Sequence, residues 1–123
     1  MAIQKKILVV DDDLLIRSVV KRDLEGQEFA IEVAADGLQG WQMVEHFSPD
    51  LVITDLNMPG MGGLELLEKI REDHRFKHLP VLCITGEENL ELKQIAIGLG
   101  ATGWVQKPFN PVTWGGTLKK LLS

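Results

Sequence analysis

The stretch LVITDLNMPG, residues 51–60, begins as an apolar, β-branched run and then stops at an aspartate, Asp55. A short run of this kind, with Pro and Gly within the next five residues, is typical of a strand that is buried on both faces. The carboxylate at its end is therefore expected close to the interior, where an unpaired charge is costly. Other parts of the chain should supply groups that compensate for this charge.

Similar apolar runs recur along the chain. Together they predict five strands, at residues 6–11, 29–34, 51–55, 80–85 and 103–107. The segments between them carry apolar residues at helical spacing. Strands that alternate with helices in this way form a parallel sheet covered by helices on both faces. We therefore expect one α/β domain over residues 1–123, a doubly wound, flavodoxin-like (βα)5 fold with strand order 2-1-3-4-5.

Each predicted helix has an apolar face. In the first it comprises Leu14, Leu15, Val19, Val20 and Leu24, and in the fourth Leu90, Ile95, Ala96 and Leu99. Asp13, Asp36 and Asn110 stand where helix-capping residues are expected, and Pro111 stands at a first helical position. Gly115 and Gly116 lie inside the last helix, where each costs about 1 kcal/mol relative to Ala. We therefore expect this helix to be the least stable, with no preference between a functional and a neutral origin for the glycines.

Composition limits the possible functions. The net charge of −5 argues against direct binding to nucleic acid, which needs clustered Lys and Arg. The only cysteine, Cys83, cannot form an internal disulfide, which is consistent with a reducing compartment. Neither a signal peptide nor a run long enough for a membrane helix is present in the sequence. We expect a cytoplasmic protein without a membrane partner.

Polar residues stand at the ends of four predicted strands. Asp11 and Asp12 follow the first strand, Asp55 ends the third, Thr85 the fourth and Lys107 the fifth. In an open parallel sheet these ends share one edge, and ligands bind where the strand order reverses. With order 2-1-3-4-5 that point lies between the first and third strands. The three aspartates are therefore expected to meet there.

Carboxylates placed so close together require a compensating charge. Two of them about 4 Å apart repel by roughly 4 kcal/mol at an effective dielectric near 20, so one is protonated or a cation lies among them. Oxygen donors favour a hard divalent ion, most plausibly Mg²⁺. Thr85 and Lys107 would offer a hydroxyl and a positive charge to an anion, which together describe a phosphoryl site. Asp55 is then the candidate nucleophile that becomes an aspartyl phosphate.

Taken singly, these residues have ordinary explanations. Asp11 and Asp12 can be loop acids, a Thr at a strand end is common, and so is a Lys before Pro. Their joint placement at four strand ends is what favours a site.

Four segments carry a family resemblance: ILVVDDD (7–13), PDLVITDLNMPGMGGLEL (49–66), VLCITGEE (81–88) and GATGWVQKPF (100–109). In this order and spacing the chain closely resembles receiver domains of two-component response regulators, whose shortest forms are the single-domain chemotaxis regulators. The resemblance implies a signalling switch phosphorylated by a sensor histidine kinase or phosphotransfer protein in a Mg²⁺-dependent reaction. It also implies a regulatory domain rather than an enzyme, one that catalyses only its own phosphorylation and dephosphorylation.

The resemblance assigns roles to individual residues. Asp55 matches the phosphoacceptor, which is also a metal ligand. Asp12 matches a direct metal ligand, Asp11 an acid that acts on the metal through water, and Asn57 a ligand through its backbone carbonyl. Asn57 and Glu87 also match the two positions that tune dephosphorylation.

Further matches concern the switch itself. Thr85 and Lys107 match residues that hold the phosphoryl oxygens and relay the change, and the Lys107–Pro108 bond is expected to be cis. On phosphorylation Thr85 would move inward, and the face made by the fourth helix, fifth strand and fifth helix would change its affinity for a partner. Trp104 stands where the family has a switching Tyr or Phe. The alternative is a Trp simply packed at the sheet edge.

Three other functions are compatible with parts of this sequence. Asp11 and Asp13 form a strand-terminal Asp-x-Asp that resembles the motif of haloacid-dehalogenase-type phosphatases. Those enzymes need a later acidic pair, but no Asp follows Asp73. A flavin-binding flavodoxin needs a phosphate loop after the first strand, where the acids would repel phosphate. A pseudo-receiver scaffold would not need the complete set of acids, Thr and Lys.

Overall fold

The computed structural model describes residues 4–56, 61–86, 90–107 and 109–122. The elements in these ranges are β1 (Lys6–Val10), α1 (Leu14–Glu25), β2 (Ala30–Ala34), α2 (Gly37–Phe47), β3 (Leu51–Asp55), α3 (Gly63–Glu72), a 3-10 turn η1 (His74–Phe76), β4 (Val81–Thr85), α4 (Leu90–Gly98), β5 (Gly103–Gln106) and α5 (Pro111–Leu121). All five predicted strands are present, each within one residue of its expected bounds. No helix in the described ranges is long and apolar enough to cross a membrane.

The five strands form one parallel sheet in the order β2-β1-β3-β4-β5. The predicted fold class and strand order are therefore confirmed. The register pairs Val9 of β1 with Ile53 of β3, and Asp55 of β3 with Ile84 of β4. Because the strands are parallel, their carboxyl ends share one edge of the sheet, and the chain reverses its strand order between β1 and β3.

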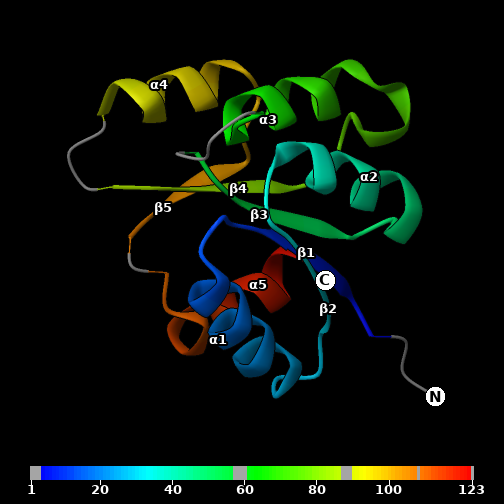
Figure 1. Cartoon of the computed structure of the whole chain (residues 1–123), viewed down its shortest axis with the longest axis vertical. Helices are drawn as coiled ribbons and strands as arrows, with labels where there is room; N and C mark the ends of the chain where they lie inside the picture. Colours follow the sequence, from blue (N-terminus) through cyan, green and yellow to red (C-terminus); the bar gives the residue numbers. More distant parts are fainter. Residues whose placement is uncertain (1–3, 57–60, 87–89, 108, 123) are drawn as a thin grey trace.

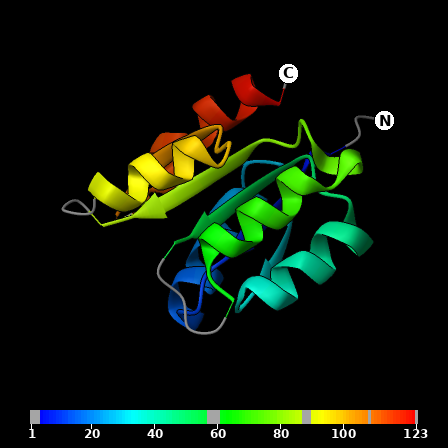
Figure 2. The ribbon, with the colours of Figure 1, turned by 90° about the horizontal axis from the view of Figure 1, so that it is seen from above.

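Helices cover both faces of this sheet. Figure 1 shows α1 and α5 on one side and α2, α3 and α4 on the other, and Figure 2 looks onto the layer of α2, α3 and α4. Strand β1 contributes side chains to the core on both faces of the sheet. Ile7 and Val9 pack in the core under α1 and α5, and Leu8 and Val10 pack in the core under α2, α3 and α4. This explains why the run is apolar throughout instead of alternating.

The predicted caps are present. Asp13, Asp36 and Asn110 each accept hydrogen bonds from backbone N–H groups in the first turn of α1, α2 and α5, and Pro111 begins α5. These side chains satisfy N–H groups that have no partner inside the helix. The helices therefore start where the sequence indicated.

Two predicted helix faces are partly wrong. Leu14 and Leu15 are exposed, although α1 buries Val20 and Leu24. At about 100° per residue Leu15 lies on the opposite side of the helix from Leu24, so both cannot face the sheet.

The predicted apolar face of α4 is also partly wrong. Leu90 and Ile95 are exposed, whereas Ala96 is buried together with the charged Lys93. Lys93 precedes Ala96 by three residues, which places the two on the same helix face. This segment therefore packs on the core through Ala96 and Leu99, as predicted. Lys93 takes the place expected of Leu90 and Ile95.

The two glycines of α5 differ in their surroundings. A Cβ on Gly115 would collide with the side chain of Gln27, whereas nothing lies within 4 Å of a Cβ on Gly116. Gln27 uses this space to donate a hydrogen bond from Nε2 to the carbonyl of Pro111 at 3.0 Å. Gly115 therefore permits close packing between the end of α1 and the start of α5.

Candidate functional site

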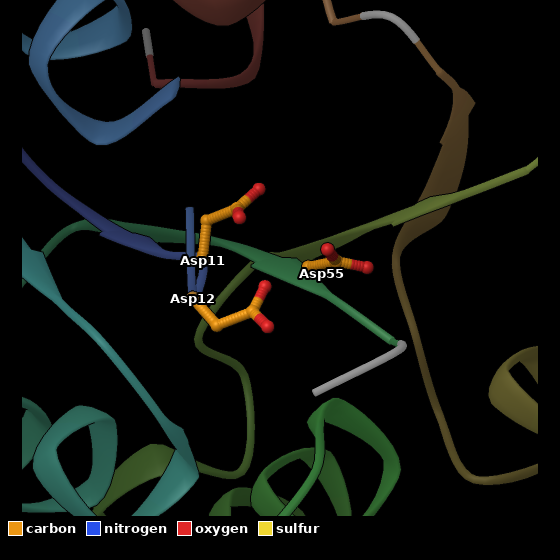
Figure 3. Close-up of side chains that lie close together, drawn as sticks. All are labelled: Asp11, Asp12 and Asp55. Atoms are coloured by element: carbon orange, nitrogen blue, oxygen red, sulfur yellow. The ribbon is translucent and has the colours of Figure 1, made fainter. Parts of the chain in front are cut away.

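Three aspartates meet where the strand order reverses. Asp11 and Asp12 follow β1 and Asp55 ends β3, as Figure 3 shows. Each offers a carboxylate oxygen, and these oxygens all lie within 4.8 Å of one another. Asp11 and Asp55 are buried while Asp12 is exposed. The structure thus brings together the three carboxylates that the strand ends predicted, with one of them open to solvent.

The electrostatics of this cluster favour a cation. At a separation of about 5 Å and an effective dielectric near 20, each pair of charged carboxylates repels by roughly 3 kcal/mol. Burial raises the pKa of Asp11, the N–H of Asp13 lowers it by donating to the carboxylate, and the charge of Asp55 raises it. An all-oxygen donor set with an exposed member fits Mg²⁺, which binds a few carboxylates and retains water.

Lys107 neutralises the charge of Asp55. Its Nζ lies 3.0 Å from Oδ2 of Asp55, and the two side chains are 37% and 3% exposed. Lys107 follows β5, and its backbone N–H donates to the carbonyl of Thr85 at 2.9 Å. From there its side chain reaches past β4 to the end of β3. The buried carboxylate that ends the run at 51–55 therefore has a cationic partner.

Thr85 is the second residue on this side of the site. It ends β4, one position beyond the residue that pairs with Asp55 in the sheet. Its Oγ1 is buried and, within the described part of the chain, has no hydrogen-bond partner. Such an atom is costly to leave unpaired. The hydroxyl is therefore available to an incoming acceptor oxygen.

The structure adds supporting residues that the sequence analysis missed. A Cβ on Gly63 would collide with the backbone carbonyl of Asp55, so α3 can begin against β3 only with glycine there. Arg17 donates from Nη1 to the carbonyl of Asp11 at 2.7 Å. The Gly62–Gly63 pair at the start of α3 was a usable signal for Gly63. No local pattern indicated Arg17.

A small apolar pocket adjoins the charged groups. Its volume is about 150 Å³, and its lining residues are Asp11, Ile16, Ile84, Lys107 and Phe109. Asp11 and Lys107 form its polar part, so the pocket connects the site with the apolar start of α1.

Some predicted site residues lie outside the described ranges. These are Asn57, Glu87 and Pro108, so the carbonyl ligand, the dephosphorylation-tuning pair and the cis bond remain predictions. Trp104 is described: it lies on β5, is 41% exposed, and has the Lys93 ammonium 4.0 Å from its ring centroid.

Comparison with known proteins gives a consistent result. Residues 7–114 match the response regulator receiver domain family. Chemotaxis protein CheY-3 of Vibrio cholerae is 43% identical over 117 residues, which cover 94% of this chain and 90% of that protein. Chemotaxis protein CheY of Pseudomonas aeruginosa is 41% identical over 106 residues, 85% of this chain and 86% of that protein.

A solved structure agrees with these sequence matches. Vibrio cholerae chemotaxis protein CheY4 superposes with a TM-score of 0.90 at 38% identity, covering 98% of this chain and all of the other. The fold and the strand order accord with this match. The chain therefore belongs to the response regulator receiver domains of two-component systems and is CheY-like.

Proposed function

We propose that this receiver domain, spanning residues 1–123, is a cytoplasmic phosphoacceptor switch. Asp55 receives a phosphoryl group from a sensor histidine kinase or phosphotransfer protein in a Mg²⁺-dependent reaction, and the α4–β5–α5 face then changes its affinity for a protein partner. The observation that carries the proposal is the position of Asp55, buried between two further carboxylates and the Lys107 ammonium. The chemotaxis proteins among its relatives support a regulatory role.

The transfer is a substitution at phosphorus. A carboxylate oxygen of Asp55 forms the new O–P bond as the P–N bond to the donor imidazole breaks, and the imidazole leaves with its electron pair and takes up a proton. Water later attacks the acyl phosphate, which restores the carboxylate and releases inorganic phosphate. Both reactions occur on the domain itself, so it is a regulatory protein that turns over no separate substrate.

The surrounding residues position the phosphoryl group. Asp11, Asp12, Asp55 and the carbonyl of Asn57 would hold Mg²⁺, which when bound neutralises charge on the phosphoryl oxygens. The ammonium of Lys107 is 3.0 Å from Asp55 in the unmodified protein. It is placed to form an ion pair with the phosphoryl oxygens once Asp55 is modified. A fixed ammonium in a partly buried site stabilises such charge more than water does.

Thr85 links the site to the surface. Its buried hydroxyl, unpaired within the described residues, gains an acceptor when a phosphoryl oxygen arrives, so the two-state equilibrium shifts toward the conformation in which that hydrogen bond forms. Thr85 pairs with Gln106 of β5, two residues from Trp104. The shift is thereby carried to the α4–β5–α5 face.

Intact mass after incubation with acetyl phosphate tests the proposal. The wild-type chain with Mg²⁺ is expected to gain one phosphoryl adduct, and Asp55→Asn is expected to gain none. Asp36→Asn is the matched control, because this aspartate caps α2 and is not one of the three clustered carboxylates, and Asn caps equally well. Wild-type protein that stays unmodified under excess donor, with its circular dichroism unchanged, would contradict the proposal and favour a pseudo-receiver scaffold.

A further inference from the structure

Lys93 is a buried cation outside the site. It lies on α4 with only 7% of its surface exposed, on the face that also buries Ala96. Its ammonium is 4.0 Å from the ring centroid of Trp104 on β5. The other cation–ring pairs of the described residues have separations of 4.8 to 5.3 Å. This pair is therefore the closest of its kind in the described structure.

The pair joins two elements of the proposed output face. Trp104 is 41% exposed on β5, which is an edge strand of the sheet. With Leu90, Gln94 and Ile97 the two residues line a pocket of about 250 Å³. The indole thus forms part of the surface that a partner would meet, and its orientation decides the shape of that pocket.

We propose that Lys93 is a positioning residue that holds Trp104 in this half-exposed orientation and so sets the resting state of the switch. The inference rests on the proposed function, because it concerns the same switch. An ammonium withdrawn from water gains from the electron-rich face of an aromatic ring, most of all a Trp ring. A Trp104 that turns away loses this contact, and with it the stabilisation that the ring and the ammonium give each other.

The contact therefore favours one conformation over the other. A ligand or contact shifts an equilibrium only by its differential interaction with the two states. Cation–π pairs of this class correspond to about a 2- to 30-fold change in such an equilibrium. Loss of the Lys93 charge should shift Trp104 toward the less exposed orientation by a factor in this range.

Fluorine NMR of protein labelled with 5-fluorotryptophan tests the orientation. The chain has three Trp residues, and Trp104→Phe assigns the resonance of interest. The difference in its chemical shift between H₂O and D₂O reports exposure of the ring to solvent. The measurement uses protein free of Mg²⁺ and of phosphodonor, so it does not depend on whether Asp55 is phosphorylated.

The variants separate charge from packing. Lys93→Met keeps the aliphatic stem and should reduce the solvent isotope shift of Trp104, while Lys93→Arg keeps the cation and should preserve it. Lys69→Met is the matched control, because Lys69 lies 5.1 Å from the ring of Trp41 and should leave Trp104 unaffected. Lys93→Gln repeats the neutral substitution in case Lys93→Met does not fold. An isotope shift of Trp104 that is unchanged in a folded neutral variant overturns the proposal.

Phosphorylation gives the second readout. With limiting acetyl phosphate and Mg²⁺, Lys93→Met should raise the initial rate of Asp55 modification about 2- to 30-fold, whereas Lys93→Arg and Lys69→Met should match the wild type. An unchanged rate in Lys93→Met, with wild type phosphorylated, overturns the role of Lys93 but leaves the phosphoacceptor function intact. If no variant is phosphorylated while the isotope shift responds as expected, the proposed function fails and the positioning of Trp104 by Lys93 stands.

Discussion

The ammonium of Lys107 and the carboxylate of Asp55 form an ion pair of 3.0 Å across β4, although the two residues are 52 positions apart in the chain. Asp55 is almost completely buried and Lys107 is partly exposed. The pair keeps a reactive carboxylate in the interior without leaving its charge uncompensated. It also means that each partner affects the stability of the unmodified protein as well as the proposed chemistry.

Removal of the cation alone should destabilise the fold. We expect Lys107→Met to lower the free energy of unfolding by about 1–3 kcal/mol, because a buried charge loses its partner while solvent near Lys107 moderates the effect. Adding Asp55→Asn to this variant should recover most of the loss, since neither member of the pair is then charged. Urea unfolding of the two single variants and the double variant measures the coupling. Additive single effects would show that the pair contributes nothing.

Thr85 should be dispensable for stability but necessary for the response. Thr85→Val keeps the shape and removes a buried oxygen that has no partner within the described residues, so the free energy of unfolding should be unchanged or higher by up to about 1 kcal/mol. The Trp104 fluorine resonance of the same variant should no longer respond to acetyl phosphate with Mg²⁺. A destabilised Thr85→Val protein with a normal response would contradict both parts.

The two glycines of α5 should respond differently to the same substitution. Gly116→Ala should stabilise the protein by about 1 kcal/mol, because Ala favours the helix and the position is open. Gly115→Ala should be less favourable than Gly116→Ala by about 1–2 kcal/mol, because the new methyl group displaces Gln27 and breaks its hydrogen bond to the carbonyl of Pro111, which offsets the helix preference of Ala. Thermal unfolding of both variants is the measurement. Equal effects would show that the contact with Gln27 does not constrain this helix.

Asp11 should be a source of instability in the metal-free protein. Asp11→Asn keeps an oxygen that can accept from the N–H of Asp13 and removes one charge from the cluster. Near neutral pH we expect the free energy of unfolding to rise by roughly 1–3 kcal/mol, somewhat less than one full carboxylate repulsion. Mg²⁺ should stabilise the wild type by binding the native state and stabilise Asp11→Asn less. A variant no more stable than wild type without metal would contradict this account.

The pH dependence of stability provides an independent check on Asp11. Its pKa in the folded protein is raised above the ordinary 3.8, chiefly by burial, so below 3.8 both states are protonated and no penalty exists. As pH rises from 3.8 through the folded pKa, the unfolded chain loses the proton first and the wild type loses stability. The stability advantage of Asp11→Asn should therefore grow over this range and then level off. Chemical unfolding at a series of pH values without metal measures it.

Much of the fold could be predicted from local patterns. The five apolar runs, the caps at Asp13, Asp36 and Asn110, and the alternation of strands and helices all indicated the observed architecture. The aspartates at strand ends were predictable for a related reason, since a parallel sheet collects its carboxyl ends at one edge. Arg17, which donates to the carbonyl of Asp11, was not predicted, because nothing in its neighbourhood marks it.

The sequence by itself determined which residues form each strand and helix and which polar groups reach the carboxyl edge, because these depend on residue spacing and local propensity. Only the tertiary structure decided that Lys107 pairs with Asp55, that Gln27 fills the space beside Gly115, and that α4 buries Lys93 beneath Trp104. These contacts depend on strand register and on the rotation of each helix about its axis. Packing of the whole core selects those two quantities, and no local stretch of sequence contains them.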